Sequence, residues 1–258
     1  MTQTLEQILR RGLEARGYTP GEETLRRFRI YFENLEKWNQ VMNLTAISGE
    51  EDVARLHFLD CAALLEAGEL SGRTLIDVGT GAGFPGLVLK ILCPELKLTL
   101  LDSLDKRLSF LEDSCEKLGF ADVQFVHARA EEMPDGFRER FDFAAARAVA
   151  RLNVLCELCL PYVKPGGAFL AMKGPELEEE LREAYVALKA LGGTAERQIA
   201  YDIPGTELRH CAAVIRKTAP TPARYPRRWA KAKKKPLQRL TSVVKSCRMS
   251  LPERDGEE

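Results

Sequence analysis

The chain reads Thr-Leu-Ile-Asp-Val-Gly-Thr-Gly-Ala-Gly-Phe-Pro-Gly from Thr74 to Gly86. A short apolar run that carries Asp77 leads into glycines at alternate positions: Gly79, Gly81 and Gly83. Because glycine has no side chain, this pattern predicts a buried strand that turns sharply and exposes its backbone to a ligand. Pro85 fits the first turn of a following helix, where the missing N–H costs nothing. A ligand site at a strand–helix junction is therefore expected here.

The glycines fit two classes of cofactor. Gly81, Gly83 and Gly86 match G-x-G-x-x-G, and Asp102 follows about twenty residues later, as in dinucleotide sites. The pattern from Asp77 to Gly83, however, resembles motif I of class I S-adenosylmethionine-dependent methyltransferases. S-adenosylmethionine has no pyrophosphate for a helix N-terminus to bind, but its cationic amino and sulfonium end can face an acid such as Asp77. An ordinary glycine-rich turn is the alternative without a ligand.

Strands and helices are expected to alternate after residue 70. The candidate strands are Thr74–Val78, Lys97–Leu101, Val123–His127, Asp142–Ala146, Ala168–Met172, Ala195–Tyr201 and Cys211–Ile215. The helices expected among them are Pro85–Leu92, Asp105–Leu118, Arg151–Tyr162 and Glu176–Ala190. Alternation at this spacing predicts an α/β fold with a doubly wound parallel sheet that binds ligands at the carboxyl ends of its strands.

The last two candidate strands are joined by a short connection around Gly205, which leaves no room for a crossover helix. They are therefore expected to be antiparallel. Seven strands with an antiparallel last strand are typical of class I methyltransferases with a Rossmann-like fold, whereas dinucleotide-binding domains are typically parallel throughout. This difference favours S-adenosylmethionine over a nicotinamide cofactor, and an NAD-dependent dehydrogenase is the less favoured alternative.

The chain divides into three parts. Residues 1–70 form a helical extension, with helical periodicity over Leu5–Arg16, Glu22–Trp38 and Glu50–Glu66. Residues 71–218 form the cofactor-binding domain, and residues 219–258 form a basic tail that is expected to be partly disordered. The chain is long enough, at 258 residues, for one substantial α/β domain with a smaller appendage.

The composition is that of a cytoplasmic globular protein. No apolar stretch reaches membrane-spanning length, and the first sixteen residues mix charges into their apolar positions, unlike a signal peptide. The seven cysteines are scattered, and Cys156-x-x-Cys159 lies in a helical apolar pattern, so core packing is favoured over metal binding. The three histidines show no metal-ligand spacing, and no metal is expected.

The net charge of zero hides a strong asymmetry. Twelve lysines and arginines and no acid lie between Arg216 and Arg248. Such a stretch, broken by prolines and carrying two aromatic residues, is typical of contact with a polyanion. The residues expected to contact RNA are Arg224, Arg227, Arg228, Lys233, Lys234 and Lys235. A solvated tail without a partner is the alternative.

Several polar residues follow the expected strands. Asp102 ends the second strand and would accept hydrogen bonds from ribose hydroxyls, or else cap the next helix. Ala130 and Glu131 follow the third strand, where a backbone amide and a carboxylate could meet the adenine edge; charge complementarity at a helix start is the alternative. Arg147 and Lys173 close the fourth and fifth strands and face the crevice.

The segment around Arg147 bears on the methyl acceptor. It has neither the Asn/Asp-Pro-Pro-aromatic motif of base amino methylation nor the cysteine that attack on pyrimidine C5 requires. Arginine commonly reads guanine O6 and N7, although an N7 that attacks a methyl group needs its lone pair free. Guanine N7 needs no general base, so positioning alone can contribute about 7–11 kcal/mol. A structural salt bridge is the alternative role for this arginine.

The combination of motifs resembles the RsmG (GidB) family of bacterial small-subunit ribosomal RNA guanine-N7 methyltransferases. The segments that carry the resemblance run from Asn43 to about Leu237: Asn43-Leu-Thr45, Arg55-Leu-His57-Phe-Leu-Asp60, Asp77 to Gly86, Leu100-Leu-Asp-Ser103 with Lys106-Arg107, Ala146-Arg147-Ala148, Met172-Lys-Gly174, Arg209-His210, and Lys217-Thr-Ala-Pro to Tyr225-Pro-Arg-Arg. Two departures are Cys211, where the family more often has an aliphatic residue, and the residues after Leu237, which have no counterpart.

The resemblance implies a site, a substrate and a partner. Beside Asp77, Gly81 and Gly83, it implies that the cofactor pocket is lined by Gly79, Phe84, Asp102, Ser103, Leu104, Ala130, Glu131 and Arg147, which moves Arg147 from the substrate to the cofactor. The implied target is a guanosine of the 530 loop of 16S rRNA, conventionally position 527, as free RNA or in the small ribosomal subunit. No catalytic residue is certain; the candidates are Lys173, Arg209 and His210. His57 and Asp60 could face RNA or pack.

A monomer is expected. The alternative within the same chemistry is a methyltransferase that acts on a small molecule or a protein, with the basic tail merely solvated.

Overall fold

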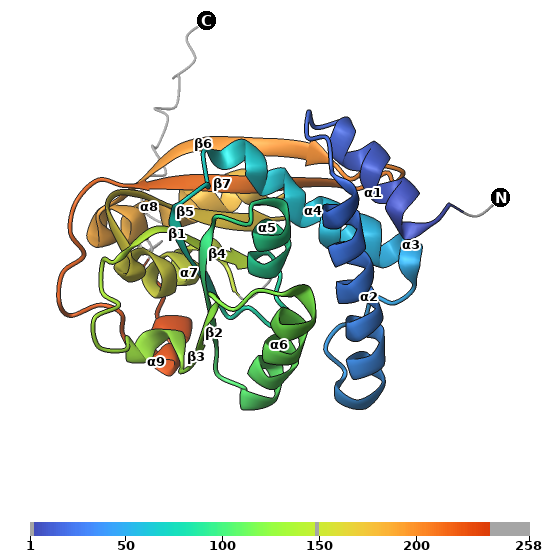
Figure 1. Ribbon diagram of the computed structural model, residues 1–258. Coiled ribbons are helices and arrows are strands. Elements are labelled where there is room, and N and C mark those ends of the chain that lie inside the picture. The colour runs from blue at the N-terminus through green and yellow to red at the C-terminus, as the bar shows by residue number, and fades with distance from the viewer. Residues whose placement is uncertain (1–2, 148–149, 238–258) are drawn as a thin grey trace, which may run out of the picture.

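The computed structural model describes residues 3–147 and 150–237. Their centre is a seven-stranded sheet in the order β3-β2-β1-β4-β5-β7-β6 (Figure 1). The strands are β1 (Thr74–Val78), β2 (Lys97–Asp102), β3 (Gln124–His127), β4 (Phe141–Arg147), β5 (Val163–Lys173), β6 (Gly193–Asp202) and β7 (Arg209–Lys217). Only β7 runs antiparallel to its neighbours β5 and β6. This confirms the α/β class I methyltransferase fold with an antiparallel last strand.

The strand boundaries differ from the expected ones mainly at β5, β6 and β7, which are longer. β7 pairs with both β5 and β6, and this pairing continues past the apolar centre of β7 into the polar residues at its ends. The helix expected over Arg151–Tyr162 is divided into α7 (Leu152–Cys159) and a 3₁₀ turn at Leu160–Tyr162, which contains Pro161. Proline cannot donate the backbone hydrogen bond that a longer α-helix would require.

Alternate residues of the strands feed two hydrophobic cores, one on each face. Leu75 and Leu100 pack with the helices α5 (Gly86–Leu92) and α6 (Asp105–Leu118). Ile76 and Leu101 pack on the other face with α7 and α8 (Leu177–Leu191). This period of two is the expected geometry of a strand that is buried on both faces. Cys156 and Cys159 lie fully buried in the second core, as core packing predicts.

The helical extension consists of α1 (Leu5–Glu14), α2 (Glu22–Met42), α3 (Glu50–Val53), a π-helical turn (Ala54–Leu59), α4 (Asp60–Ala62) and a 3₁₀ turn (Ala63–Ala67). Figure 1 shows these helices gathered beside α5 and α6. They share the first core with the sheet, and a ring cluster of Phe28, Tyr31, Phe58 and Phe84 joins the two parts. The extension is thus packed directly against the α/β part of the chain.

The chain turns back after β7 and crosses the face of the second core. Arg138 donates hydrogen bonds to the carbonyl oxygens of Thr221, Pro222 and Tyr225. The segment then enters the short helix α9 (Trp229–Lys234) beside α7. We call residues 218–237 the C-terminal strap. The remainder of the expected basic tail lies outside the described residues. Within the described residues, no helix is both long and apolar enough to span a membrane.

Candidate functional site

The glycine loop after β1 is held from below by Asp77. Its Oδ2 accepts hydrogen bonds from Thr80 Oγ1 at 2.6 Å and from the backbone N–H of Gly86 at 2.9 Å. A Cβ atom at Gly86 would lie 2.8 Å from that oxygen, so only glycine allows α5 to start this close to the strand. Asp77 is fully buried and does not line the cavity described below. The structure therefore places this acid beneath the loop, whereas the sequence predicted an acid facing the ligand.

One oxygen of Asp77 is still unused. Oδ1 is buried and has no hydrogen-bond partner among the described residues. Burial raises the pKa of Asp77 to about 6, against the hydrogen bonds from Thr80 and Gly86 that lower it. A buried carboxylate oxygen without a partner can accept a hydrogen bond from a donor that the protein does not supply, directly or through water.

A cavity of about 470 Å³ opens above the loop, at the carboxyl ends of β1, β2, β3 and β4. This is where an α/β sheet of this topology binds ligands, and the volume suits a cofactor. Of the residues expected to bind cofactor, those that line it are Gly79, Gly81, Phe84, Asp102, Ser103, Ala130, Glu131 and Arg147. Gly83 does not: a Cβ there would meet the Tyr31 hydroxyl at 2.6 Å, so this glycine makes room for the helical extension. Leu104 is exposed outside the cavity.

Asp102 closes β2 at the floor of the cavity. Its carboxylate accepts hydrogen bonds from the backbone N–H groups of Gly81 at 2.9 Å and Leu104 at 3.0 Å, and pairs with Arg107 at 3.3 Å. Asp102 does not cap the next helix, whose N-cap is Leu104, but it orders the turn before that helix and presents an acid to the cavity. Each carboxylate oxygen has two lone pairs, so a ribose hydroxyl can still donate to it.

The opposite end of the cavity is built by Arg147, Phe84 and His57. The guanidinium carbon of Arg147 lies 4.7 Å from the centroid of the Phe84 ring, and the His57 ring lies 4.3 Å from the same centroid. Arg147 Nη2 lies 3.0 Å from His57 Nδ1. Because a guanidinium group can only donate, Nδ1 accepts and Nε2–H donates to Thr45 Oγ1 at 2.9 Å. Burial, aided by the charge of Arg147, lowers the pKa of His57 to about 3, so this imidazole is neutral at physiological pH.

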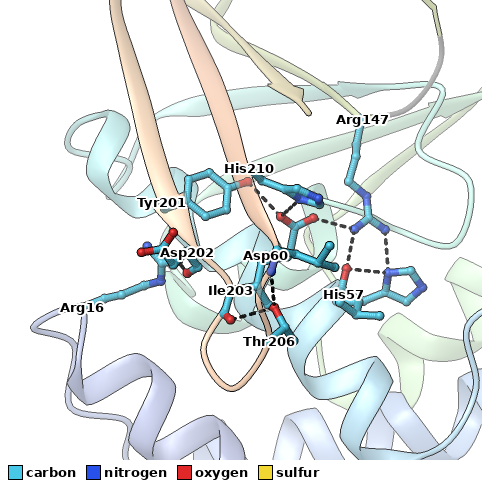
Figure 2. A network of polar contacts seen from close by, with 11 residues as sticks. Arg16, His57, Asp60, Arg147, Tyr201, Asp202, Ile203, Thr206 and His210 are labelled. Carbon is cyan, nitrogen blue, oxygen red and sulfur yellow. Dashed lines mark hydrogen bonds and ion pairs between the residues drawn. The ribbon is translucent and has the colours of Figure 1, made fainter. Parts of the chain in front are cut away.

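Asp60 holds this end together. Figure 2 shows its carboxylate between Arg147 on one side and His210 and Tyr201 on the other. Asp60 Oδ2 accepts from Arg147 at 3.1 Å, and Oδ1 lies 2.9 Å from both the Tyr201 hydroxyl and His210 Nδ1. Burial would raise the pKa of Asp60, but the hydrogen bond from His210 and the charge of Arg147 hold it below its usual value. The hydrogen bond to Asp60 raises the pKa of His210. We call Arg147, His57, Asp60, Tyr201 and His210 the acceptor-end network.

The three catalytic candidates occupy different environments. Lys173 is nearly buried; its Nζ donates to the carbonyl oxygen of Ala150 and pairs with Glu180 at 2.8 Å, so its ammonium group is already bonded within the protein. The side chain of Arg209 is 70% exposed at the start of β7, 4.0 Å from Asp202. Of the three, only His210 belongs to the acceptor-end network, and none of them lines the cavity.

The basic residues of the strap fall into two groups, one paired within the protein and one exposed to solvent. Arg227 is fixed by two hydrogen bonds to Glu157, at 2.7 and 2.6 Å, and the Glu157 side chain is 1% exposed. The charge pattern suggested Arg227 as a phosphate ligand, but the structure uses it as an anchor for the strap. Residues with exposed side chains are Arg224, Arg228, Lys233, Lys234 and Lys235.

Trp229 was missed as a cavity residue. It lines the cavity beside Ala130 and Glu131, and its backbone N–H donates to Glu131 Oε1 at 3.2 Å. Nothing in its local sequence signals this role, because the contact joins residues 98 positions apart. Thr45 was not predicted as a cavity residue either, although it lines the cavity from the helical extension.

The residues present fit S-adenosylmethionine. The cavity offers an acid at the β2 end, the exposed backbone of the glycine loop, and a neutral imidazole beside an aromatic ring. Beneath the loop lies the Asp77 oxygen that lacks a donor. No group of three or more His, Cys, Asp or Glu residues that could hold a metal ion occurs in residues 3–147 and 150–237.

Comparison with known proteins gives a consistent match. The family model described as rRNA small subunit methyltransferase G matches residues 24–202. The chain is 46% identical over 234 residues to the ribosomal RNA small subunit methyltransferase G of Alkaliphilus metalliredigens, covering 90% of this chain and 98% of that protein. It is 44% identical over 229 residues to the protein of that name in Listeria monocytogenes, covering 88% and 96%.

Solved structures share the fold. TrmN from Thermus thermophilus superposes with a TM-score of 0.50 at 21% identity, over 69% of this chain and 53% of that one. A predicted O-methyltransferase from Agrobacterium tumefaciens superposes with a TM-score of 0.50 at 16% identity, over 64% and 83%.

Proposed function

This chain belongs to the rRNA small subunit methyltransferase G family, and from that premise we propose that it methylates N7 of a guanosine in the 530 loop of 16S rRNA with S-adenosylmethionine. The observation that carries the proposal is the cavity at the carboxyl ends of β1, β2, β3 and β4, which is lined by the glycine loop and, at its far end, by Arg147 and His57 of the acceptor-end network. We place the enzyme in the cytoplasm and propose that it acts as a monomer.

Different residues of the cavity contact different parts of the cofactor. Asp102 accepts hydrogen bonds from the ribose hydroxyls, and Ala130 with Glu131 faces the adenine edge. The backbone of Gly79 and Gly81 lies against the middle of the cofactor. The amino acid end is directed toward Phe84 and Arg147, above the free oxygen of Asp77.

When bound, S-adenosylmethionine supplies a methyl group on a sulfonium, which guanine N7 attacks through its lone pair without losing a proton. The product base carries the positive charge that the sulfonium gives up. The protein therefore needs no general base, and its task is to hold the base in line with the methyl group. The neutral state of His57 suits this reaction, because the imidazole adds no positive charge beside the base, and the charge of Arg147 is balanced by Asp60.

The acceptor base is expected to enter past Leu44 and Thr45, which border the cavity from the helical extension. Single-stranded loops offer bases that can be extruded for chemistry at low cost. The exposed cations of the strap, Arg224, Arg228, Lys233, Lys234 and Lys235, are proposed to contact rRNA phosphates. Arg227 is excluded from this set because it is paired with Glu157.

The test is methyl transfer from labelled S-adenosylmethionine to unmodified small ribosomal subunits and, in parallel, to naked 16S rRNA. The expected product is one 7-methylguanosine in the 530 loop, located by site-specific cleavage at that base. A heat-unfolded enzyme and rRNA that is already modified at the site are the controls. Failure to label either substrate would contradict the proposed activity, and label in a different nucleotide would contradict the proposed target.

A further inference from the structure

The C-terminal strap is held against the body of the protein at three points. Near its start, the backbone N–H of Thr221 donates to Glu139 Oε1 at 2.6 Å, and the same oxygen pairs with Lys217 Nζ, which is fully buried at the end of β7. Arg138 clamps three carbonyl oxygens of residues 221–225. Arg227 pairs with the buried Glu157 of α7. These contacts give the strap a fixed course, and breaking the Arg227–Glu157 pair would leave the buried carboxylate of Glu157 without a partner.

This course ends at one particular wall of the cavity. Trp229 is the first residue of α9, and its N–H is bonded to the carboxylate of Glu131. Three residues further on, Ala232 is fully buried in the second core. Both anchors lie on the inward side of the helix, so Trp229 is held next to Ala130 and Glu131, where it lines the cavity. Figure 1 shows α9 beside the segment that follows β3.

The chemistry of this wall suits a purine. An indole offers a broad aromatic face, and stacking of a base on an aromatic side chain contributes about 1–3 kcal/mol per base. The Glu131 carboxylate beside it can accept a hydrogen bond from an exocyclic amino group. We propose that Trp229 is a cofactor-contacting residue, and that the C-terminal strap thereby completes the adenine end of the S-adenosylmethionine site. The inference rests on the proposed function, because it takes S-adenosylmethionine as the cofactor.

The assignment gives the basic strap a second role. Lys231, Lys233, Lys234 and Lys235 are exposed, and the Nζ atom of Lys233 lies 5.8 Å from the centroid of the Trp229 ring. One short segment thus carries the cavity wall and, on its solvent side, the cations proposed to bind rRNA. A strap that bound RNA alone would not need an aromatic residue inside the cofactor cavity.

Intrinsic fluorescence tests the contact in the intact fold. The protein has two tryptophans, and the other, Trp38, is bonded to Asp113 and does not line the cavity. In a Trp38→Phe variant, Trp229 is therefore the sole emitter. S-adenosylhomocysteine should change its tryptophan emission, with half-saturation at the dissociation constant that calorimetry gives for the same variant. In the converse variant, Trp229→Phe, the emission of Trp38 should remain constant during the titration.

Calorimetry with S-adenosylhomocysteine measures the contribution to affinity. Trp229→Ala should raise the dissociation constant about tenfold, because the stacking face is lost. Trp229→Phe retains a ring and should stay within about threefold of the wild type. Unchanged emission in Trp38→Phe, together with wild-type affinity in both Trp229 variants, would overturn the inference while leaving the proposed function intact. If the wild-type protein bound no S-adenosylhomocysteine, the proposed function itself would fail.

Discussion

The two ends of the cavity that we propose for the cofactor are built in opposite ways. The acceptor end is a network of buried charged and polar side chains from three distant segments: the helical extension with His57 and Asp60, the end of β4 with Arg147, and the β6–β7 hairpin with Tyr201 and His210. The adenine end is closed by one indole and one backbone hydrogen bond from the strap. Arg138 and Glu157, which anchor the strap, do not line the cavity, whereas Arg147 and His57 of the acceptor-end network do.

This difference indicates which substitutions should lower the stability of the protein and which should not. A buried ionic network stabilises the protein only while every member keeps its partner, because removal of one leaves an uncompensated charge. An indole beside a ligand contributes contact area and can be removed without leaving a charge behind. Substitutions at the acceptor end should therefore damage both fold and function, whereas substitutions of strap residues that face the cavity or the solvent should change ligand affinities alone.

The largest effect is expected from Asp60→Asn. The variant keeps the shape of the side chain but removes the negative charge that balances Arg147 and His210, and the free energy of unfolding should fall by about 3–5 kcal/mol. Denaturant unfolding measures the change. The matched control is Asp202→Asn, at an exposed carboxylate near Arg209, which should remain within about 0.5 kcal/mol of the wild type. Equal losses in the two variants would remove the distinction between a buried network and ordinary surface charge.

A second test changes the geometry at the acceptor end and keeps its charge. Arg147→Lys retains the cation but cannot reach Asp60, His57 and the Leu56 carbonyl oxygen together, as the guanidinium does. We expect kcat/KM for methyl transfer to fall on the order of 10²-fold, since small misplacements near the reacting groups cost this much. Arg209→Lys, at an exposed position, is the control for a change of cation type. Activity near the wild-type level in Arg147→Lys would show that charge alone suffices there.

The pH dependence of stability tests the burial of His57 at the acceptor end. The pKa of His57 is about 3 in the folded protein and about 6.5 in the unfolded chain. Between these values the unfolded state binds the proton and the folded state does not, so this residue lowers stability as the pH falls. The expected contribution is on the order of 1.4 kcal/mol per pH unit. It is measured as the difference between the wild type and His57→Gln in denaturant unfolding from pH 7 to pH 4.5.

Comparison with the variant is necessary because Asp77 titrates in the opposite sense. Its pKa of about 6 in the folded protein lies above the ordinary carboxyl value, so acidification through this range favours the folded state. The two contributions partly cancel in the wild type. A pH-independent difference between the wild type and His57→Gln would contradict the assignment of a neutral, buried imidazole.

The smallest effect is expected on the outer side of the strap. Replacing Lys234 and Lys235 by alanine should reduce the slope of log affinity for 16S rRNA against log salt concentration by about one unit for each lost phosphate contact. Stability and affinity for S-adenosylhomocysteine should remain at wild-type levels. Arg182→Ala removes an exposed cation of α8, which we do not place near the RNA, and should leave the slope unchanged. Identical slopes for all three proteins would show that the strap does not bind RNA through these lysines.

The sequence was sufficient to predict those features that depend on neighbouring residues alone. The glycine loop and the strands could be predicted because backbone freedom at Gly79 and Gly81 and apolar runs of strand length are readable without tertiary contacts. Asp77 was harder, because a carboxylate above the loop and one below it have the same sequence pattern. Its burial follows from the close approach of α5 at Gly86.

The ends of the cavity could not be predicted, because distant segments build them. Glu131 meets Trp229 across 98 positions, and Asp60 meets His210 across 150. A count of charges cannot distinguish one cation of the strap from another. In the structure Arg227 is paired with the buried Glu157, so it is not available to RNA as the exposed cations are. Lys173 was predicted as a catalytic candidate because it ends β5. In the structure its ammonium group pairs with Glu180 and donates to the Ala150 carbonyl oxygen.

A crystal structure of the protein with S-adenosylhomocysteine tests most directly the claim that one cavity holds the cofactor between these two unlike ends. We expect the adenine ring against Trp229 and Glu131, the ribose hydroxyls at Asp102, and the sulfur directed toward Phe84 and the acceptor-end network. A ligand bound with its adenine at the Arg147 end, or outside this cavity, would contradict the account.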